Sequence, residues 1–452
     1  MEPPRPKKRM KTEAEVEPKQ LLPDDLVLEI VARCPTIADV IRCAAASKPI
    51  RRGILHASFL RRFRGFLIRN GGEHGHGRPP VRKLLLGLYH QSSDPHRQPA
   101  FVSVSDGVNL PPTVAALPPA PNRDDDAGGS ECQFGSYLLV ASRRSLLVLR
   151  RRCKNGAKDH LVERHGIHPV ELSVCNPTTG ERRVLPPHDV HDMSHALLDV
   201  DPIAPSSFKL LVAELSEGDP STLYVQIFSS EEGEWGPPLA CPIANSRGDV
   251  EDSCEFNCAA LRPRPVVVGD TVHWLCTTDF GDSILTWRWR GGGLAHEASI
   301  VKLPRGYKFG RPEKCLAVLP STPGDAAGSQ ALLSLIVLDR GEIEVWARER
   351  SGAAGSTMKW KLWHRIQEAS IPRPANFCDG WLSGAELSWF CEGSGTLFLQ
   401  AGDETMSSLL LDLESMEVSK LEARKWELNP EPEFCPYEVD LLSYMMFVMK
   451  QF

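Results

Sequence analysis

The chain has 452 residues, a formal net charge of −6, 42% hydrophobic residues and 24% charged residues. These values are ordinary for a globular protein of two or three domains, and they indicate neither nucleic acid nor a membrane as a partner. No apolar run approaches the roughly 18 residues of a membrane-spanning helix, and the N-terminus lacks the apolar core of a secretory signal. The 13 cysteines are scattered, which favours reduced thiols in an intracellular protein.

Residues 1–20 are polar and without periodicity, so we expect a disordered tail. Residues 6–11 within it read PKKRMK, a basic cluster of the nuclear-import type, although a merely solvated tail has the same composition. We therefore expect the protein in the nucleus, the cytoplasm or both.

Residues 22–63 have the spacing of three short helices. Pro35 ends the first helix, Thr36 begins a capping box for the second, and Ser47 is the expected N-cap of the third. Apolar side chains of the first helix recur at helical spacing and predict one apolar stripe: Leu26, Val27, Ile30, Val31 and Cys34.

This segment resembles the F-box. The family pattern is Leu-Pro-x-Asp-Leu, a later Glu-Ile pair, a proline, an Arg-Cys step, a Ser-Lys step and a Phe-Leu pair. Two positions depart from the pattern, because Ile50 replaces the family's Trp and Cys34 replaces the Leu before the first proline. The matching residues are Leu22, Pro23, Asp25, Leu26, Glu29, Ile30, Pro35, Arg42, Cys43, Ser47, Lys48, Phe59 and Leu60.

The resemblance implies docking to a Skp-type adaptor and, through the adaptor, to a cullin ubiquitin ligase. A unit of this size buries too little apolar surface to be robust alone, which also favours a partner. The alternative is a helical hairpin of a larger α-rich domain. We assign residues 21–66 to the F-box and residues 67–80 to a linker. The expected adaptor contacts are Leu22, Pro23, Leu26, Ile30, Ile41, Ser47, Lys48, Ile50 and Phe59.

The segment between Val40 and Gly72 holds eight basic residues and no acidic one. Such a charge pattern is compatible with nucleic-acid binding. We favour a face complementary to an acidic adaptor, because no row of aromatic residues accompanies the charge.

From about Val81 the pattern changes to short apolar runs separated by turns, which predicts an all-β domain over residues 81–452. The length fits six blades of a β-propeller at roughly sixty residues each. The ten Trp residues are expected in packing between blades. The predicted strand pairs are 137–141 with 146–149, 171–175 with 183–185, 208–215 with 223–229, 266–268 with 271–276, and 332–338 with 343–347.

Several of these runs resemble the propeller-like domain that follows the F-box in plant F-box proteins. The residues in question are VCNPTTG at 174–180 with LPP at 185–187, YVQIFSS at 224–230 with GEW at 233–235, and VGDTVHW at 268–274. These segments indicate architecture rather than a ligand.

The sequence contains no GxxxxGK[S/T], GxGxxG after a strand, HExxH, GxSxG or CxxC motif, so we predict no catalytic residue, cofactor or metal. The best metal candidate is the row His188, His191 and His195, whose imidazoles converge only if the segment is helical; a polar loop is the alternative. Cys254 and Cys258 lack a matching second pair.

The favoured interpretation is a substrate receptor of a Skp–cullin–F-box ubiquitin ligase, without an enzymatic activity of its own. The helices dock the adaptor, and the β domain holds a target protein near the ubiquitin-loaded enzyme. One alternative is an F-box scaffold that does not promote degradation. Another is a β-propeller carbohydrate-active enzyme, which requires carboxylates or a metal at the propeller axis.

Overall fold

The structure is a computed structural model. It describes residues 22–34, 37–56, 58–63, 84–91, 99–104, 114, 117, 134–153, 171–190, 194–200, 207–216, 221–244, 258–262, 264–278, 281–289, 298–304, 313–320, 331–351, 357–374, 377–401, 407–421, 433–439, 444–445 and 448–449. The predicted tail and the predicted linker lie outside these ranges. Within them, no helix is long and apolar enough to cross a membrane.

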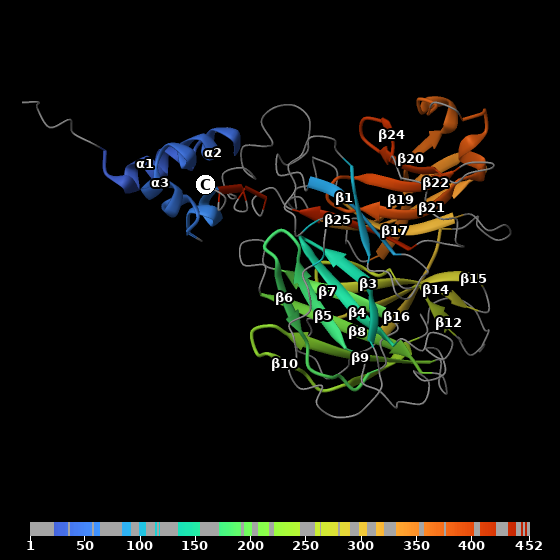
Figure 1. The fold of residues 1–452 in the computed structure, drawn as a ribbon. Helices are drawn as coiled ribbons and strands as arrows, with labels where there is room; N and C mark the ends of the chain where they lie inside the picture. The colour runs from blue at the N-terminus through green and yellow to red at the C-terminus, as the bar shows by residue number, and fades with distance from the viewer. Residues whose placement is uncertain are drawn as a thin grey trace, which may run out of the picture.

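The N-terminal part is a compact helical unit, as predicted (Figure 1). It consists of α1 (Asp24–Val31), α2 (Ile37–Ala46), α3 (Lys48–Ile54) and further helical residues at 58–63. Acidic side chains fill the first turn of α1, where the helix dipole favours negative charge. The predicted N-cap of α3 is confirmed, because the Ser47 hydroxyl accepts a hydrogen bond from the Ile50 amide at 3.5 Å.

The apolar residues of α1 divide between two faces instead of forming the single predicted stripe. Val31 is buried among α2 and α3, whereas Leu26 and Ile30 point outward. Gly53 allows the close approach of α1 to α3, because a Cβ there would lie 2.4 Å from the Leu28 side chain.

The chain's C-terminal end completes the core of this helical unit. Met445 is 0% exposed and Met449 is 1% exposed, and both pack in the cluster that contains Val40, Ile54 and Phe63. This segment belongs to the range assigned from sequence to the β domain, yet it lies against the helices (Figure 1).

The rest of the described chain is mostly β-structure, which confirms the predicted class. The strands form consecutive antiparallel sheets in chain order. The first holds β1 (Leu84–Gln91) and β2 (Ala100–Ser103), and the last strand, β25 (Glu433–Val439), pairs with β1. The next sheet consists of β3 (Phe134–Arg143), β4 (Leu146–Cys153), β5 (Leu172–Asn176) and β6 (Glu181–Val184).

Two further sheets follow and join through a short parallel pair between β11 and β16. The ends of this combined sheet also approach each other, because β13 contacts β7 and β12 contacts β8. Its strands are β7 (Ser194–Val200), β8 (Phe208–Leu215), β9 (Thr222–Ser229), β10 (Glu234–Trp235), β11 (Leu239–Ala244), β12 (Cys258–Leu261), β13 (Val266–Val268), β14 (Thr271–Thr278), β15 (Gly281–Arg288) and β16 (Ala298–Lys302).

The last two sheets each have four strands in sequential order. Two short 3-10 helices, η1 (Glu368–Ser370) and η2 (Trp381–Gly384), lie between them in the chain. The strands are β17 (Glu313–Pro320), β18 (Ala331–Asp339), β19 (Glu342–Ser351), β20 (Thr357–Gln367), β21 (Glu386–Cys391), β22 (Thr396–Ala401), β23 (Ser407–Asp412) and β24 (Val418–Lys420).

The turns explain why the hairpins were readable from sequence. Arg144 and Ser145 both have positive φ, at 47° and 71°, between β3 and β4, and Arg340 and Gly341 do the same between β18 and β19. Two consecutive residues with positive φ form a type I′ turn, whose twist matches the right-handed twist of the two strands that it joins.

Six strands form a closed ring of contacts. The order is β25, β3, β7, β13, β17, β21 and β25 again. One link spans 294 residues of sequence, where the Ser142 hydroxyl donates to the Pro436 carbonyl oxygen at 2.7 Å. One of the two largest apolar cores lies within the combined sheet and includes the buried Trp274 and Trp287, and the other joins the last two sheets.

Candidate functional site

The outer side of α1 is an exposed apolar surface, which we call the α1 face and define as Leu22, Leu26 and Ile30. These side chains are 58%, 52% and 58% exposed. Leu26 and Ile30 are four residues apart within α1, so they lie along one side of the helix, and Leu22 lies directly before the N-cap residue Pro23. Among the described residues, the other large exposed hydrophobic side chain is Met358 on β20. The exposed apolar surface is therefore concentrated on α1.

The nine predicted adaptor contacts fall into two groups. Pro23 and Lys48 are exposed like the α1 face, and Ile41 and Ser47 are half-buried. Ile50 and Phe59 are buried instead, with 7% and 1% of their surface exposed. These two side chains support the helices from within and do not present a contact surface.

The helical unit carries more basic than acidic side chains. Glu29 is paired on both sides, with Arg33 at 3.1 Å and Arg62 at 3.0 Å. Lys48, Arg52 and Arg61 are exposed as well. The described helical residues include seven basic and four acidic side chains, so the unit has a net positive charge, with Asp24 and Asp25 exposed in the first turn of α1.

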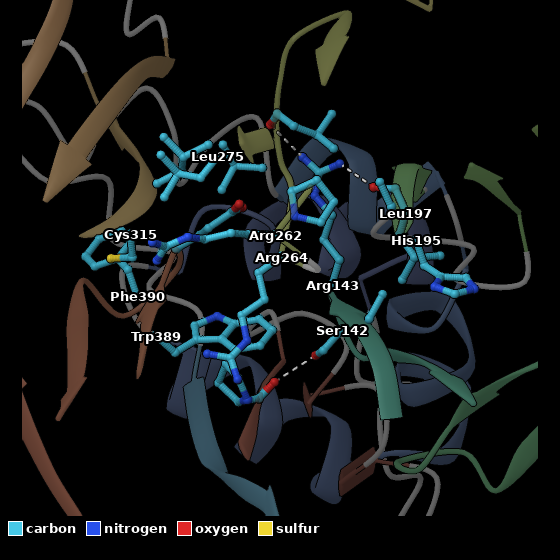
Figure 2. Close-up of a pocket in the computed structure, with 18 of the residues that line it drawn as sticks. Ser142, Arg143, His195, Leu197, Arg262, Arg264, Leu275, Cys315, Trp389 and Phe390 are labelled. Atoms are coloured by element: carbon cyan, nitrogen blue, oxygen red, sulfur yellow. Dashed lines mark hydrogen bonds between the residues drawn. The ribbon is translucent and has the colours of Figure 1, made fainter. Parts of the chain in front are cut away.

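A second candidate site is a cavity of about 240 Å³ inside the ring of six strands (Figure 2). We call it the inner cavity. All six strands of the ring contribute to its wall. Apolar groups such as Leu275, Leu316, Trp389 and Phe390 alternate with charged ones. The inner cavity is therefore a composite of sheets that are far apart in sequence.

Five cationic side chains and two carboxylates line the inner cavity. The carboxylates are Glu392 and Glu438, and the cations are Arg143, Arg144, Arg262, Arg264 and Lys314. Figure 2 shows three of the arginines within the same pocket. The wall consequently carries more positive than negative charge.

Arg143 connects three strands of the ring. Its guanidinium donates to the carbonyl oxygens of Leu197 at 2.7 Å and Leu198 at 2.8 Å on β7, and to that of Val267 at 3.3 Å on β13. Burial lowers the pKa of Arg143 from its ordinary value, but an arginine remains charged. This side chain both ties the ring together and brings positive charge to the cavity.

Arg264 lies on the opposite wall. Its guanidinium stacks 4.6 Å above the Trp389 ring and donates to the Ser388 carbonyl oxygen. Stacking of this kind holds a guanidinium against an aromatic surface.

The carboxylates near the cavity already have partners. Glu438 accepts hydrogen bonds from the Gly393 and Ser394 amides, the shortest at 2.7 Å. Asp282 accepts from the buried Lys314 ammonium at 2.7 Å and lies 3.9 Å from Arg262.

The described part of the chain does not assemble the metal site considered from the sequence. It contains no group of three or more His, Cys, Asp or Glu residues placed to hold a metal. His188 packs edge-on against Trp235 outside any helix, His195 lies on β7, and His191 is outside the described residues. Burial raises the pKa of the Cys315 thiol to about 12, which suppresses its reactivity.

The inner cavity is the site that the sequence analysis missed. Its cations stand singly or in pairs at strand ends, and they gather only through the ring. The local signals were slight: Arg143 and Arg144 in a turn, and Arg262 and Arg264 on either side of a proline.

These features define a class: a mostly β protein with an N-terminal helical unit and a charged inner cavity. The family model described as "Domain of unknown function (DUF7595)" matches residues 128–452. The chain belongs to this family. No curated protein matches it.

Solved structures with some similarity include a DUF4784 family protein from Bacteroides caccae ATCC 43185. The match has 9% sequence identity and a TM-score of 0.35, and it covers 76% of this chain and 72% of that chain. The match to puromycin hydrolase has 12% sequence identity and a TM-score of 0.33, and it covers 64% of this chain and 47% of that chain. The match to oligopeptidase B from Trypanosoma brucei has 12% sequence identity and a TM-score of 0.27, and it covers 62% of this chain and 32% of that chain. The chain thus spans less than half the length of the latter two.

Proposed function

We propose that the protein is a substrate receptor of a Skp–cullin–F-box ubiquitin ligase. The observation that carries the proposal is the α1 face, two exposed aliphatic side chains on one side of α1 and a third directly before its N-cap, in a small helical unit. Exposed apolar surface concentrated in this way marks an interaction site. The net positive charge of the helical unit suits an acidic adaptor.

We also propose that the β domain is a six-bladed propeller. Three observations support it: the sheets follow one another in chain order, six of their strands form a closed ring of contacts, and β25 pairs with β1. Pairing between the first and last strands closes such a ring and leaves no open sheet edge at the junction.

In this proposal the chain performs no reaction itself. The adaptor binds the α1 face, while the propeller holds the target protein at a fixed distance from the ubiquitin-loaded enzyme. Raising the effective concentration of one protein beside another accelerates transfer without new chemistry. Met445 and Met449, which follow β25 in the chain, pack in the core of the helices and so connect the two parts at a second point.

The proposal is tested by co-expression of the full-length chain with a Skp-type adaptor, followed by size-exclusion chromatography. We expect co-elution at one-to-one for the wild type. Leu26→Glu with Ile30→Glu should abolish it, because two charges would face the apolar surface of the adaptor. Leu22→Ala with Pro23→Ala should weaken or abolish it as well.

The matched control is Met358→Glu, which places the same charge on an exposed apolar side chain of β20, 43% exposed and outside the helical unit. This variant should co-elute like the wild type. Co-elution of the Leu26→Glu, Ile30→Glu variant at wild-type level would refute the proposed docking face.

A further inference from the structure

The inner cavity is positively charged in a protein whose net charge is −6. Its cations come from separate sheets: Arg143 from β3, Arg264 from the connection between β12 and β13, and Lys314 from β17. Since like charges repel, gathering them at one axis costs stability unless a ligand or a function offsets the cost.

The internal carboxylates compensate this charge only in part. The ion pair between Lys314 and Asp282 is largely internal, with 6% and 19% of the side chains exposed. Glu438 accepts from backbone amides. The hydrogen bonds of Arg143 to Leu197 and Leu198 go to carbonyl oxygens, which satisfy its N–H groups but do not carry a full negative charge. Glu392 is the carboxylate that acts most strongly on Arg143.

The remaining arginines can be reached by a ligand. The Arg262 side chain is 45% exposed, and it shares Asp282 with Lys314 at the longer distance of 3.9 Å. Arg264 is held against Trp389. Next to these two cations lie apolar groups, including Phe390. The cavity therefore combines an anion-binding wall with an apolar one.

The volume limits what can enter. About 240 Å³ is smaller than a typical pocket for a drug-sized ligand, so it accepts one or two side chains rather than a large cofactor. Arginine pairs bind carboxylates and phosphates through parallel N–H donors.

We propose that the inner cavity binds an acidic segment of the recruited protein. A carboxylate or phosphate group of that segment sits against Arg262 and Arg264, and a neighbouring apolar side chain packs on Trp389 and Phe390. That the segment belongs to a ubiquitination target rests on the proposed function. The preference for an anion rests on the charges of the cavity alone.

The test measures fluorescence anisotropy of labelled peptides with the full-length protein at physiological salt. The probes are Glu-Glu-Phe-Glu-Glu, its phosphoserine form at the fourth position, and Gln-Gln-Phe-Gln-Gln as the neutral control. We expect both acidic peptides to bind and the neutral one to bind at least about tenfold more weakly, because charge-assisted hydrogen bonds contribute most of the affinity.

Arg262→Gln with Arg264→Gln should weaken binding of the acidic peptides by about tenfold or more. The matched control, Arg288→Gln with Arg373→Gln, removes the same two charges from exposed positions outside the cavity and should change binding less than about twofold. Arg262→Lys with Arg264→Lys keeps the charge but loses the parallel N–H donors and the planar stacking, so its affinity should lie between those of the wild type and the Gln variant, which separates charge from folding.

Equal losses in the cavity variant and the control variant would overturn the proposal, and so would tight binding of the neutral peptide. Binding of inorganic phosphate or citrate at the arginines without binding of either acidic peptide would also overturn it, in favour of a free small anion. Adaptor co-elution depends on the α1 face, so it reports on the proposed function separately.

Discussion

Single side chains decide how the sheets are held around the axis. Arg143 reaches from β3 to carbonyl oxygens on β7 and β13, which no backbone ladder joins directly to β3. Ser142, its neighbour, donates to Pro436 on β25. Two adjacent residues thus link one strand to both sides of the ring, because successive side chains of a strand point to opposite faces.

A buried histidine makes stability depend on pH. His273 on β14 is 6% exposed, and burial, with a smaller contribution from Arg348, lowers its pKa from 6.5 to about 3. The unfolded chain binds a proton here below about pH 6.5, whereas the folded chain does not until about pH 3. Stability from this group is therefore complete above pH 6.5 and decreases as the pH falls from 6.5 towards 3.

We expect the free energy of unfolding to be about 2 kcal/mol lower at pH 5 than at pH 8 because of His273. Chemical denaturation at the two pH values measures the difference. His273→Gln should remove about one proton of this dependence, while His56→Gln, at an exposed position, should leave it unchanged. An unchanged pH dependence in His273→Gln would show that this side chain is accessible to protons in the folded state.

At the scale of elements, two hairpin turns contain a glycine with positive φ but have different surroundings. Gly341 has φ 80°, and a Cβ there would lie 2.8 Å from the Ser383 hydroxyl on η2. Gly269 has φ 59° with no heavy atom within 4 Å of the same position. The first turn is thus limited by conformation and by space, the second by conformation alone.

We expect Gly269→Ala to lower the free energy of unfolding by about 1 kcal/mol, because alanine is strained at positive φ. Gly341→Ala should cost about 1 kcal/mol more, because its methyl group overlaps Ser383. Adding Ser383→Ala should restore the additional stability lost in Gly341→Ala, and it should restore none of the stability lost in Gly269→Ala. Denaturant titrations measure all four variants, and equal costs at the two glycines would contradict the role of Ser383.

At the scale of the whole molecule, the two ends of the chain form one core. Met445 and Met449 follow the closing strand β25 and pack among α1, α2 and α3. The helical unit therefore obtains part of its buried surface from the opposite end of the sequence, which a unit of this size needs.

We expect Met445→Ala with Met449→Ala to destabilise the helical unit, since each buried Met→Ala change costs about 2–5 kcal/mol. Amides of α1–α3 should exchange with deuterium at least about tenfold faster, while amides of the β domain remain protected. Adaptor binding should weaken in parallel. Met358→Ala is the exposed control, and unchanged exchange in the double variant would mean that the helices fold without the C-terminal segment.

The sequence by itself determined the local elements. The helices followed from apolar spacing and the Ser47 cap, and the hairpins from turn residues such as Gly180 and Gly341, because each signal lies within a few residues of the structure it specifies. The same information did not separate the two faces of α1, since Leu26 and Val31 are equally apolar and only neighbouring helices decide which is covered.

Tertiary structure decided the rest. The pairing of β25 with β1, the packing of Met445 among the helices and the gathering of Arg143, Arg262 and Arg264 join residues from distant parts of the chain. The hydrophobic periodicity of the sequence does not reveal such contacts, because they form when the ring closes and do not depend on the local conformational preference of any one segment. The candidate docking face was therefore within reach of sequence reasoning, and the inner cavity was not.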